Sequence, residues 1–252
     1  MAVPKEILDI SAYAGQVILI NGGEVYRVEN TISYICEAYG INDSHSLVTP
    51  TGIFVTIDDG SKNAHTIVKR IHNREVNLNK ISQINDLSHN LKDESLSYGQ
   101  AMKKLTKINA QSNQYSLVLT IIMACLASAA NVVLMNKSLL NIIPAILASL
   151  SAQLLVNSGK ILKDKMSFVS DLAAGFITGS LSLFMFQRGL GTDLSIIIVS
   201  ALLPFVPGVA LTNAIRDAIN KDLISSASRA IETGLVAINL AIGVAIALRV
   251  FQ

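Results

Sequence analysis

A polar stripe follows two prolines late in an otherwise apolar chain. Pro204 and Pro207 interrupt an apolar run, because proline removes a backbone N–H donor and clashes with the preceding helical turn. Helical spacing resumes at Gly208, and the i, i+4 pattern places the next polar residues on one face. An arginine there can bind a substrate carboxylate, and an aspartate can bind an amino group or a proton. The stripe consists of Thr212, Asn213, Arg216, Asp217, Asn220 and Lys221.

Two interpretations of this stripe are open. Many transporters build substrate sites from broken helices with polar groups beside them, so residues 204–217 are a candidate substrate pathway. Alternatively, the helix leaves the membrane near Ile215, and Arg216 snorkels into the headgroup region. The proline break favours the pathway.

Four further polar residues lie in or near the expected membrane helices. Asp171 and Glu232 are candidates for coupling or binding, since charge inside a bilayer is costly. Acids at helix ends also cap helices or pair with nearby Lys and Arg. Gln153 and Asn239 are candidates for substrate contact, although interhelical hydrogen bonds explain them equally well.

The N-terminal part offers three candidates for a cytoplasmic gate. Glu24 and Arg27 follow a Gly-Gly pair, and Thr51 stands at the start of an expected strand. The alternatives are a local ion pair at a helix N-terminus for the first two and a simple turn for Thr51.

The composition indicates a membrane protein. The 252 residues are 51% hydrophobic and 15% charged, with a mean hydropathy of +0.48. Stretches of about 20 apolar residues are long enough to cross the hydrocarbon core of a bilayer. We therefore expect an all-α bundle of five transmembrane helices over residues 115–252. The expected spans are 115–135, 139–157, 168–186, 194–215 (broken near 204–208) and 230–250.

Positive charges on the flanks of these spans predict the orientation. Nine Lys or Arg flank one side and three flank the other, which places the N-terminus in the cytoplasm and the C-terminus outside. The first group is Lys103, Lys104, Lys107, Lys160, Lys163, Lys165, Arg216, Lys221 and Arg229, and the second is Lys137, Arg188 and Arg249.

Residues 1–114 predict a cytoplasmic α+β domain. Apolar residues recur at helical spacing in 5–21 and 24–39, and again in 78–91 and 98–108. Short β-branched runs between them predict three strands, with turn residues at 58–61. The expected order is ααβββαα.

Several function classes find no support in the sequence. The sequence has no nucleophile–base pair and no Gly-rich phosphate loop that would indicate an enzyme. Its cysteines and histidines lack the spacing of metal ligands. We expect no metal and no cofactor. The sequence also lacks a basic stripe interleaved with aromatic residues, which would indicate nucleic-acid binding.

Four blocks of sequence resemble the threonine/serine exporter family, specifically the larger subunit of its two-subunit form. The blocks are residues 21–31 (NGGEVYRVENT), 49–56 (TPTGIFVT), 76–85 (VNLNKISQIN) and 204–217 (PFVPGVALTNAIRD). The resemblance implies a bacterial inner-membrane secondary exporter of small polar metabolites. It suggests threonine, serine or a dicarboxylate such as succinate as substrate, and implies transport rather than catalysis.

The resemblance also implies a partner. Full-length members carry about ten spans, so the missing half would be a separately encoded subunit of four or five spans. Because half a carrier encloses little volume, we expect an oligomer in the lipid bilayer. The alternative function is a membrane-anchored sensor or scaffold that acts through its cytoplasmic α+β domain.

Overall fold

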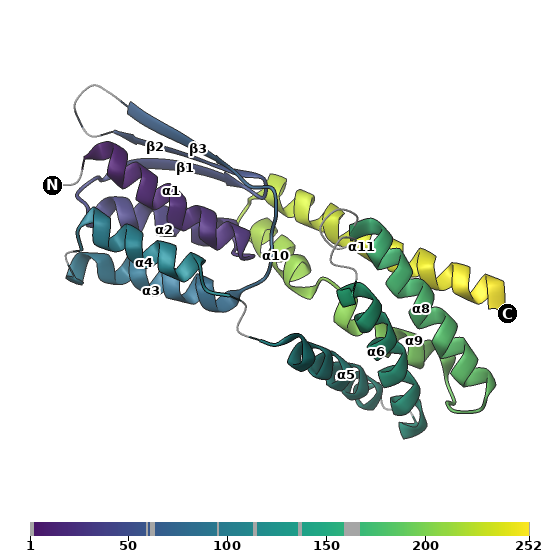
Figure 1. Cartoon of the computed structure of the whole chain (residues 1–252). Coiled ribbons are helices and arrows are strands. Elements are labelled where there is room, and N and C mark those ends of the chain that lie inside the picture. Colours follow the sequence, from purple (N-terminus) through teal and green to yellow (C-terminus); the bar gives the residue numbers. More distant parts are fainter. Residues whose placement is uncertain are drawn as a thin grey trace. The chain divides into compact units, whose positions relative to one another are not determined.

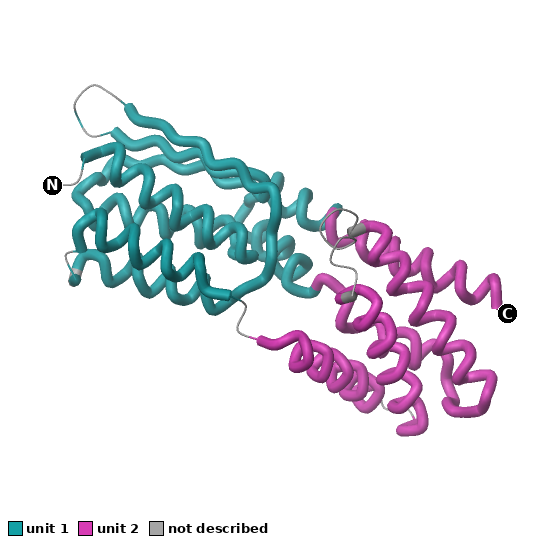
Figure 2. The backbone as a smooth tube through the Cα atoms, in the orientation of Figure 1, with its two compact units in different colours: residues 1–114, 208–231 teal, residues 115–207, 232–252 magenta. Residues whose placement is uncertain are grey.

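The computed structural model describes residues 3–58, 60, 64–94, 96–112, 115–135, 138–158 and 167–251. The chain forms two compact units, which Figure 2 shows in different colours. Unit 1 contains residues 1–114 and 208–231, and unit 2 contains residues 115–207 and 232–252. Residues 208–231, which we expected in the transmembrane domain, therefore belong to the same compact unit as the N-terminal domain.

Unit 1 is an α+β domain in which two helices lie between a sheet and a second pair of helices (Figure 1). The predicted small sheet is confirmed: it is antiparallel, with the strand order β1–β2–β3. Helices α1 and α2 cover one face of this sheet. The bounds are α1 (Pro4–Ile20), α2 (Val25–Ala38), β1 (Asp43–Thr49), β2 (Gly52–Asp58), β3 (Ala64–Arg70), α3 (Leu78–Glu94), α4 (Tyr98–Asn109), α10 (Gly208–Ile219) and the start of α11 (Leu223–Phe251).

The middle position of α1 explains its composition. The helix is buried on the side that meets the sheet and on the side that meets α2, α3 and α4. Ile10, Ile18 and Leu19 are fully buried, which is the pattern of a helix surrounded by protein rather than a surface helix. These residues belong to one core that also contains Ile32, Ile53 and other residues of α2 and the sheet.

The sheet has regular register and one open face. Leu47, Phe54 and Val68 are cross-strand neighbours, and all three are exposed on the face away from α1 and α2. Of the expected 58–61 turn, Gly60 has a positive φ and donates its N–H to Asp58. The rest of that turn, Asp59 and Ser61, lies outside the described residues.

Unit 2 is helical. Within the described residues, four helices are long and apolar enough to cross a membrane, and a broken pair raises the number to five if it counts as one span. The prediction of several apolar helices that could span a membrane is confirmed, while the count of five stays a prediction. The helices are α5 (Leu117–Leu134), α6 (Ile142–Ser158), α8 (Ser167–Gln187), α9 (Leu194–Leu202) and the later part of α11, with short 3₁₀ turns at η1 (Leu139–Asn141) and η2 (Leu203–Phe205).

The broken pair is interrupted at the two prolines. Helix α9 ends at Leu202, the 3₁₀ turn η2 contains Pro204, and α10 begins at Gly208, directly after Pro207. Proline has no N–H to donate to the preceding turn, so a continuous α-helix cannot keep its hydrogen bonds through this stretch. Of the flanking charges that predict the orientation, Lys137, Lys160, Lys163 and Lys165 lie outside the described residues, and the orientation stays a prediction.

Helices α8 and α11 pack with their backbones in direct contact. A Cβ added at Gly175 would overlap the carbonyl oxygen of Leu240, and one added at Gly243 would overlap that of Leu172. Glycine at these positions permits the close approach typical of membrane helix pairs. Gly234, on the same helix α11, meets no atom within 4 Å.

We expect Gly243→Ala to destabilise unit 2 by about 1–3 kcal/mol, because the added methyl group forces two helix backbones apart. The matched control is Gly234→Ala, which replaces a helical glycine in open space and should be neutral or slightly stabilising. The measurement is the thermal unfolding midpoint of the purified protein in detergent. Equal midpoints for the two variants would contradict close α8–α11 packing.

Candidate functional site

The loop between α1 and α2 is shaped by two glycines. Gly22 has a φ of +87°, a backbone conformation that residues with a Cβ rarely adopt. A Cβ on Gly23 would overlap the side chain of Ile18. The loop therefore needs glycine at both positions, and its Gly22 and Gly23 carbonyl groups point to partners elsewhere in unit 1.

Those partners come from α10 and from the start of α11. Asn213 donates its side-chain N–H to the Gly22 carbonyl at 2.8 Å, and Arg229 donates to the Gly23 carbonyl at 2.9 Å. The Val25 N–H contacts the Asp217 carboxylate at 3.4 Å. Residues some 190 to 206 positions apart in the sequence thus meet at one loop.

Asp217 and Arg229 form a buried ion pair. The distance from Arg229 Nε to Asp217 Oδ2 is 3.0 Å, and the side chains of Arg229 and Asp217 are 3% and 0% exposed. Charges so deeply buried are tolerated only when they are paired and hydrogen-bonded. Here the loop supplies the additional hydrogen bonds through Val25 and Gly23.

The orientation of α10 follows from these contacts. Its buried residues are Asn213, Ala214 and Asp217. Its apolar residues Leu211 and Ile215 are exposed. Of the polar stripe predicted from the sequence, Asn213 and Asp217 therefore pack against the loop of unit 1, while its other members are exposed, namely Thr212, Arg216, Asn220 and Lys221.

Next to the buried pair, Glu24 binds two arginines. Its carboxylate accepts a hydrogen bond from Arg27 Nε at 2.8 Å and another from Arg216. Burial by itself disfavours the charged form of Glu24. The hydrogen bonds from Arg27, from its own backbone and from Arg216 outweigh this effect, so the pKa of Glu24 lies below its ordinary value. Glu24 is therefore ionised at neutral pH.

The side chains of both arginines are partly exposed. The side chain of Arg27 is 33% exposed and that of Arg216 is 58% exposed, whereas that of Glu24 is 8% exposed. A guanidinium group has five N–H donors, and Glu24 uses only some of them. The remaining donors can bind a second carboxylate, which is the anion that arginine recognises best.

A cavity of about 410 Å³ lies beside this cluster, within unit 1. The volume is in the range of small-molecule sites, which is about 300–1,000 Å³. Its lining combines the three charged side chains with amides, hydroxyls and a few apolar groups. The lining residues are Gly22, Glu24, Arg27, Leu78, Ile81, Ser82, Asn85, Val209, Thr212, Asn213 and Arg216.

Two sets of candidates that the sequence left separate meet at this cavity. Glu24 and Arg27, expected at a gate, line it together with Thr212, Asn213 and Arg216, expected along a pathway. Asp217 does not line the cavity, but its ion pair with Arg229 helps to fix the position of α10. Gly208 is the first residue of α10, and Thr212 bonds back to its carbonyl at 3.0 Å.

The other candidates lie elsewhere. Thr51 stands at the turn between β1 and β2 and contacts Thr49, and it is not among the lining residues. Pro204 and Pro207 belong to unit 2. So do Gln153 and Asn239, which are buried, Asp171, which is half-buried on α8, and Glu232, which is exposed on α11.

Sequence reasoning did not single out Arg229 or the residues of α3. Arg229 was counted only as a flanking charge, although a lone arginine near the start of an apolar helix is a signal that a carboxylate lies near it. Ser82 and Asn85 line the cavity from α3. They belong to the block at residues 76–85 that carries part of the family resemblance, and this membership was the only sequence signal that pointed to them.

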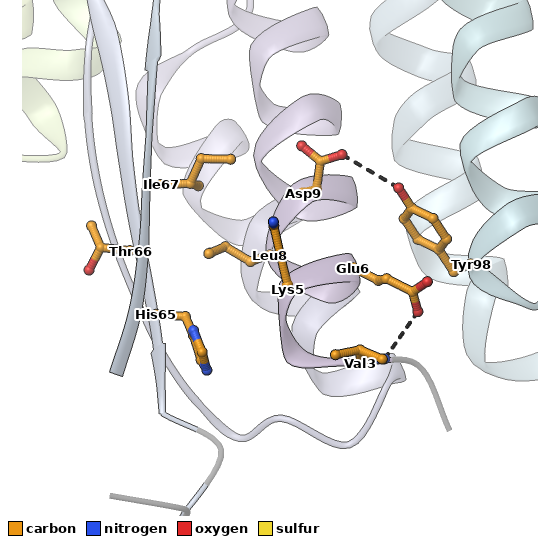
Figure 3. Close-up of a pocket in the computed structure, with 9 residues that line it drawn as sticks. All are labelled: Val3, Lys5, Glu6, Leu8, Asp9, His65, Thr66, Ile67 and Tyr98. Atoms are coloured by element: carbon orange, nitrogen blue, oxygen red, sulfur yellow. Dashed lines mark hydrogen bonds between the residues drawn. The ribbon is translucent and has the colours of Figure 1, made fainter. Parts of the chain in front are cut away.

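A second cavity, of about 630 Å³, lies on unit 1 between α1, β3 and Tyr98 of α4 (Figure 3). Its acids are bound by neighbours. Asp9 accepts a hydrogen bond from Lys69 at 3.1 Å and lies 3.5 Å from the Tyr98 hydroxyl, and Glu6 accepts from the Val3 N–H at 3.0 Å. This cavity is larger, but no arginine is among its described lining residues. The cavity at Glu24 is lined by two partly exposed arginines and is therefore the stronger candidate site.

Within the described residues, no group of three or more His, Cys, Asp or Glu is placed to hold a metal ion. The charged, amide and hydroxyl groups that line the cavity at Glu24 can bind a charged or polar small molecule.

We expect Arg229→Met to destabilise unit 1 by about 3–5 kcal/mol, because it leaves the Asp217 carboxylate buried without its cation. The matched control is Arg216→Met, whose ion pair is half-exposed and should contribute no more than about 1 kcal/mol. Thermal unfolding of the purified protein measures both. Similar losses for the two variants would contradict the distinction between a buried and an exposed pair.

A family model described as "Putative threonine/serine exporter" matches residues 9–251, which is nearly the whole sequence. No curated protein and no solved structure matches. A match of this extent, together with the apolar helices of unit 2, identifies a membrane protein of a transport family. The chain belongs to the threonine/serine exporter family.

Proposed function

We propose that this chain is a subunit of a gradient-driven secondary transporter in a bacterial inner membrane, which exports threonine, serine and similar amino acids. In this proposal the N-terminal domain is cytoplasmic, the cavity at Glu24, Arg27 and Arg216 captures the substrate, and the pathway continues near the break at residues 204–208. The observation that carries the proposal is that two partly exposed arginines, Arg27 and Arg216, both bind the ionised carboxylate of Glu24.

The charges around the cavity fit a free amino acid. The substrate carboxylate would bind the unused N–H donors of Arg27 and Arg216, and the ammonium group would bind Glu24. The amides of Asn85 and Asn213 and the hydroxyls of Ser82 and Thr212 offer donors and acceptors for a polar side chain. Hydroxylated amino acids match this combination.

A dicarboxylate such as succinate fits less well. The two arginines would accept one of its carboxylates, but the second would meet Glu24, whose lowered pKa keeps it negative. Two neighbouring carboxylates repel each other. We therefore propose that hydroxylated amino acids are better substrates than succinate.

A separate small membrane subunit and an oligomeric assembly complete the proposal. The four or five candidate spans among the described residues offer little enclosed volume for a substrate, so a further set of helices would close the pathway. We propose a partner of four or five spans from the same exporter family.

Wild-type protein reconstituted with the small partner subunit should move labelled threonine and serine, and labelled succinate more slowly. Proteoliposomes loaded with each solute and diluted into solute-free buffer measure the efflux, with and without an imposed proton gradient. Efflux of succinate alone would reverse the order of substrates. No efflux of any of the three, from correctly inserted protein, would favour a sensor or scaffold role.

Arg216→Ala should lower threonine efflux at least about tenfold, because a charge-assisted contact to the substrate carboxylate contributes about 1.5–3 kcal/mol. The control is Lys5→Ala, which removes an exposed cation at the other cavity of unit 1 and should leave efflux unchanged. Protein yield and the elution volume of the assembly verify that both variants fold. Unchanged efflux in Arg216→Ala would leave Arg216 with a headgroup role.

A further inference from the structure

Helix α10 and the first residues of α11 expose large apolar side chains, although both segments belong to unit 1. Ile219 on α10 is 74% exposed, and Ile224 on α11 is 78% exposed. Large exposed apolar patches mark surfaces that bind a protein or a membrane. The exposed large apolar residues in this part of unit 1 are Leu211, Ile215, Ile219, Leu223, Ile224 and Ile231.

The residues of α10 divide into three sectors around the helix axis, because positions three or four apart lie on one side of a helix. One sector is buried in unit 1, one is apolar and exposed, and one is polar and exposed. The buried sector consists of Asn213, Ala214 and Asp217, the exposed apolar sector of Leu211, Ile215 and Ile219, and the exposed polar sector of Thr212, Arg216 and Asn220, which directly follows the helix. Both exposed sectors therefore extend along most of the helix.

This division fits a helix that lies in the surface of a membrane. Such a helix turns its apolar side to the acyl chains and its polar side to headgroups and water. A helix that crosses the bilayer would instead carry the exposed Arg216 into hydrocarbon, where an arginine is costly. With 12 residues, α10 is also only about 18 Å long, which is shorter than the hydrocarbon core of about 30 Å.

The chain on both sides of this surface leads into apolar helices. On the N-terminal side, α10 directly follows η2 and α9, neither of which contains a charged residue. On the C-terminal side, α11 continues to Phe251 as one helix of 29 residues and is a candidate membrane span. About 20 residues cross the hydrocarbon core, so residues 232–251 are sufficient and residues 223–231 extend to the depth of the headgroups. Chain continuity therefore indicates that lipid covers the exposed apolar side chains.

The other exposed apolar group of unit 1 lacks this connection. Leu47, Phe54 and Val68 lie on the open face of the sheet. The sheet is flanked in the sequence by α2 and α3, and neither helix is among the candidate spans of the described residues. This face therefore provides an internal control, with apolar side chains of similar exposure and no tie to a membrane helix.

We propose that α10 and the first residues of α11 form a lipid-binding surface of unit 1, and that α10 lies parallel to the membrane plane at the boundary between headgroups and acyl chains. The partner is the bilayer itself. The apolar sector of α10 contacts the acyl chains, while Thr212 and Arg216 face water. Because Asn213 and Asp217 attach α10 to the loop between α1 and α2, the same surface docks the α+β domain on the membrane. The inference depends neither on the substrate nor on transport.

A single introduced tryptophan tests this surface, since the sequence contains no tryptophan of its own. In the full-length protein in liposomes, Leu211→Trp, Ile215→Trp and Ile219→Trp should each lose fluorescence when the acyl chains of the lipid carry bromine, and should resist quenching by aqueous acrylamide. Phe54→Trp is the matched control on the sheet, and it should lose fluorescence to acrylamide and not to brominated lipid. Asn220→Trp, in the polar sector, should also be quenched by acrylamide.

The depth of the three positions distinguishes a helix in the membrane plane from one that crosses it. Positions 211 and 219 are eight residues apart, which is about 12 Å along the helix axis. A helix in the plane predicts that bromines near the headgroups quench all three tryptophans more than bromines near the chain ends do, in the same ratio. A ratio that changes steadily from 211 to 219 would mean that α10 crosses the bilayer, and would overturn the inference.

Two further outcomes would also contradict lipid contact. If all three apolar positions resist both quenchers, a second copy of this chain or another subunit covers them. If acrylamide alone quenches them, the apolar sector lies in water. Leu223→Trp and Ile224→Trp, at the start of α11, carry the same prediction and replace any variant that elutes as an aggregate. Quenching is measured without substrate, so a protein that transports nothing gives the same answer.

Discussion

The buried ion pair between Asp217 and Arg229 is the interaction on which the arrangement of unit 1 depends. Removing two charges from water costs more than their attraction returns unless other groups complete their hydrogen bonds. The loop at Gly22–Gly23 supplies these groups from its backbone. A loop without the positive φ of Gly22 would not present its carbonyls in this way, so the two glycines and the ion pair form one cooperative contact.

The cavity is a consequence of that contact. With Asp217 and Asn213 fixed on the loop, the helical spacing of α10 brings Arg216 beside Glu24. Glu24 stands at the N-cap of α2 but makes no side-chain cap hydrogen bond, because its carboxylate turns to the two arginines instead. Its negative charge still lies at a helix N-terminus, where the helix dipole stabilises it.

Sequence patterns predicted the helices and strands better than they predicted which residues these elements pack against. The helical spacing of apolar residues in 5–21 was sufficient to predict a helix, and β-branched runs were sufficient to predict the three strands, because both patterns are local. The side of α10 that packs inward is not a local property. The polar stripe is a local pattern, but the partners of Asn213 and Asp217, which are Gly22 and Arg229, are not its sequence neighbours. Helical spacing alone therefore could not predict which members of the stripe are buried.

The two units handle polarity in different ways. Unit 1 buries charges and pairs them with opposite charges. Unit 2 buries only uncharged polar groups among its described residues, and its helices pack closely through Gly175 and Gly243. A charged group buried among such neutral groups would have no counter-charge, at a cost that neutral hydroxyls cannot offset. The same holds for each end of a zwitterion, because its carboxylate and its ammonium group both lose their water. The paired charges of unit 1 and the neutral interior of unit 2 therefore represent two different solutions to the burial of polar groups.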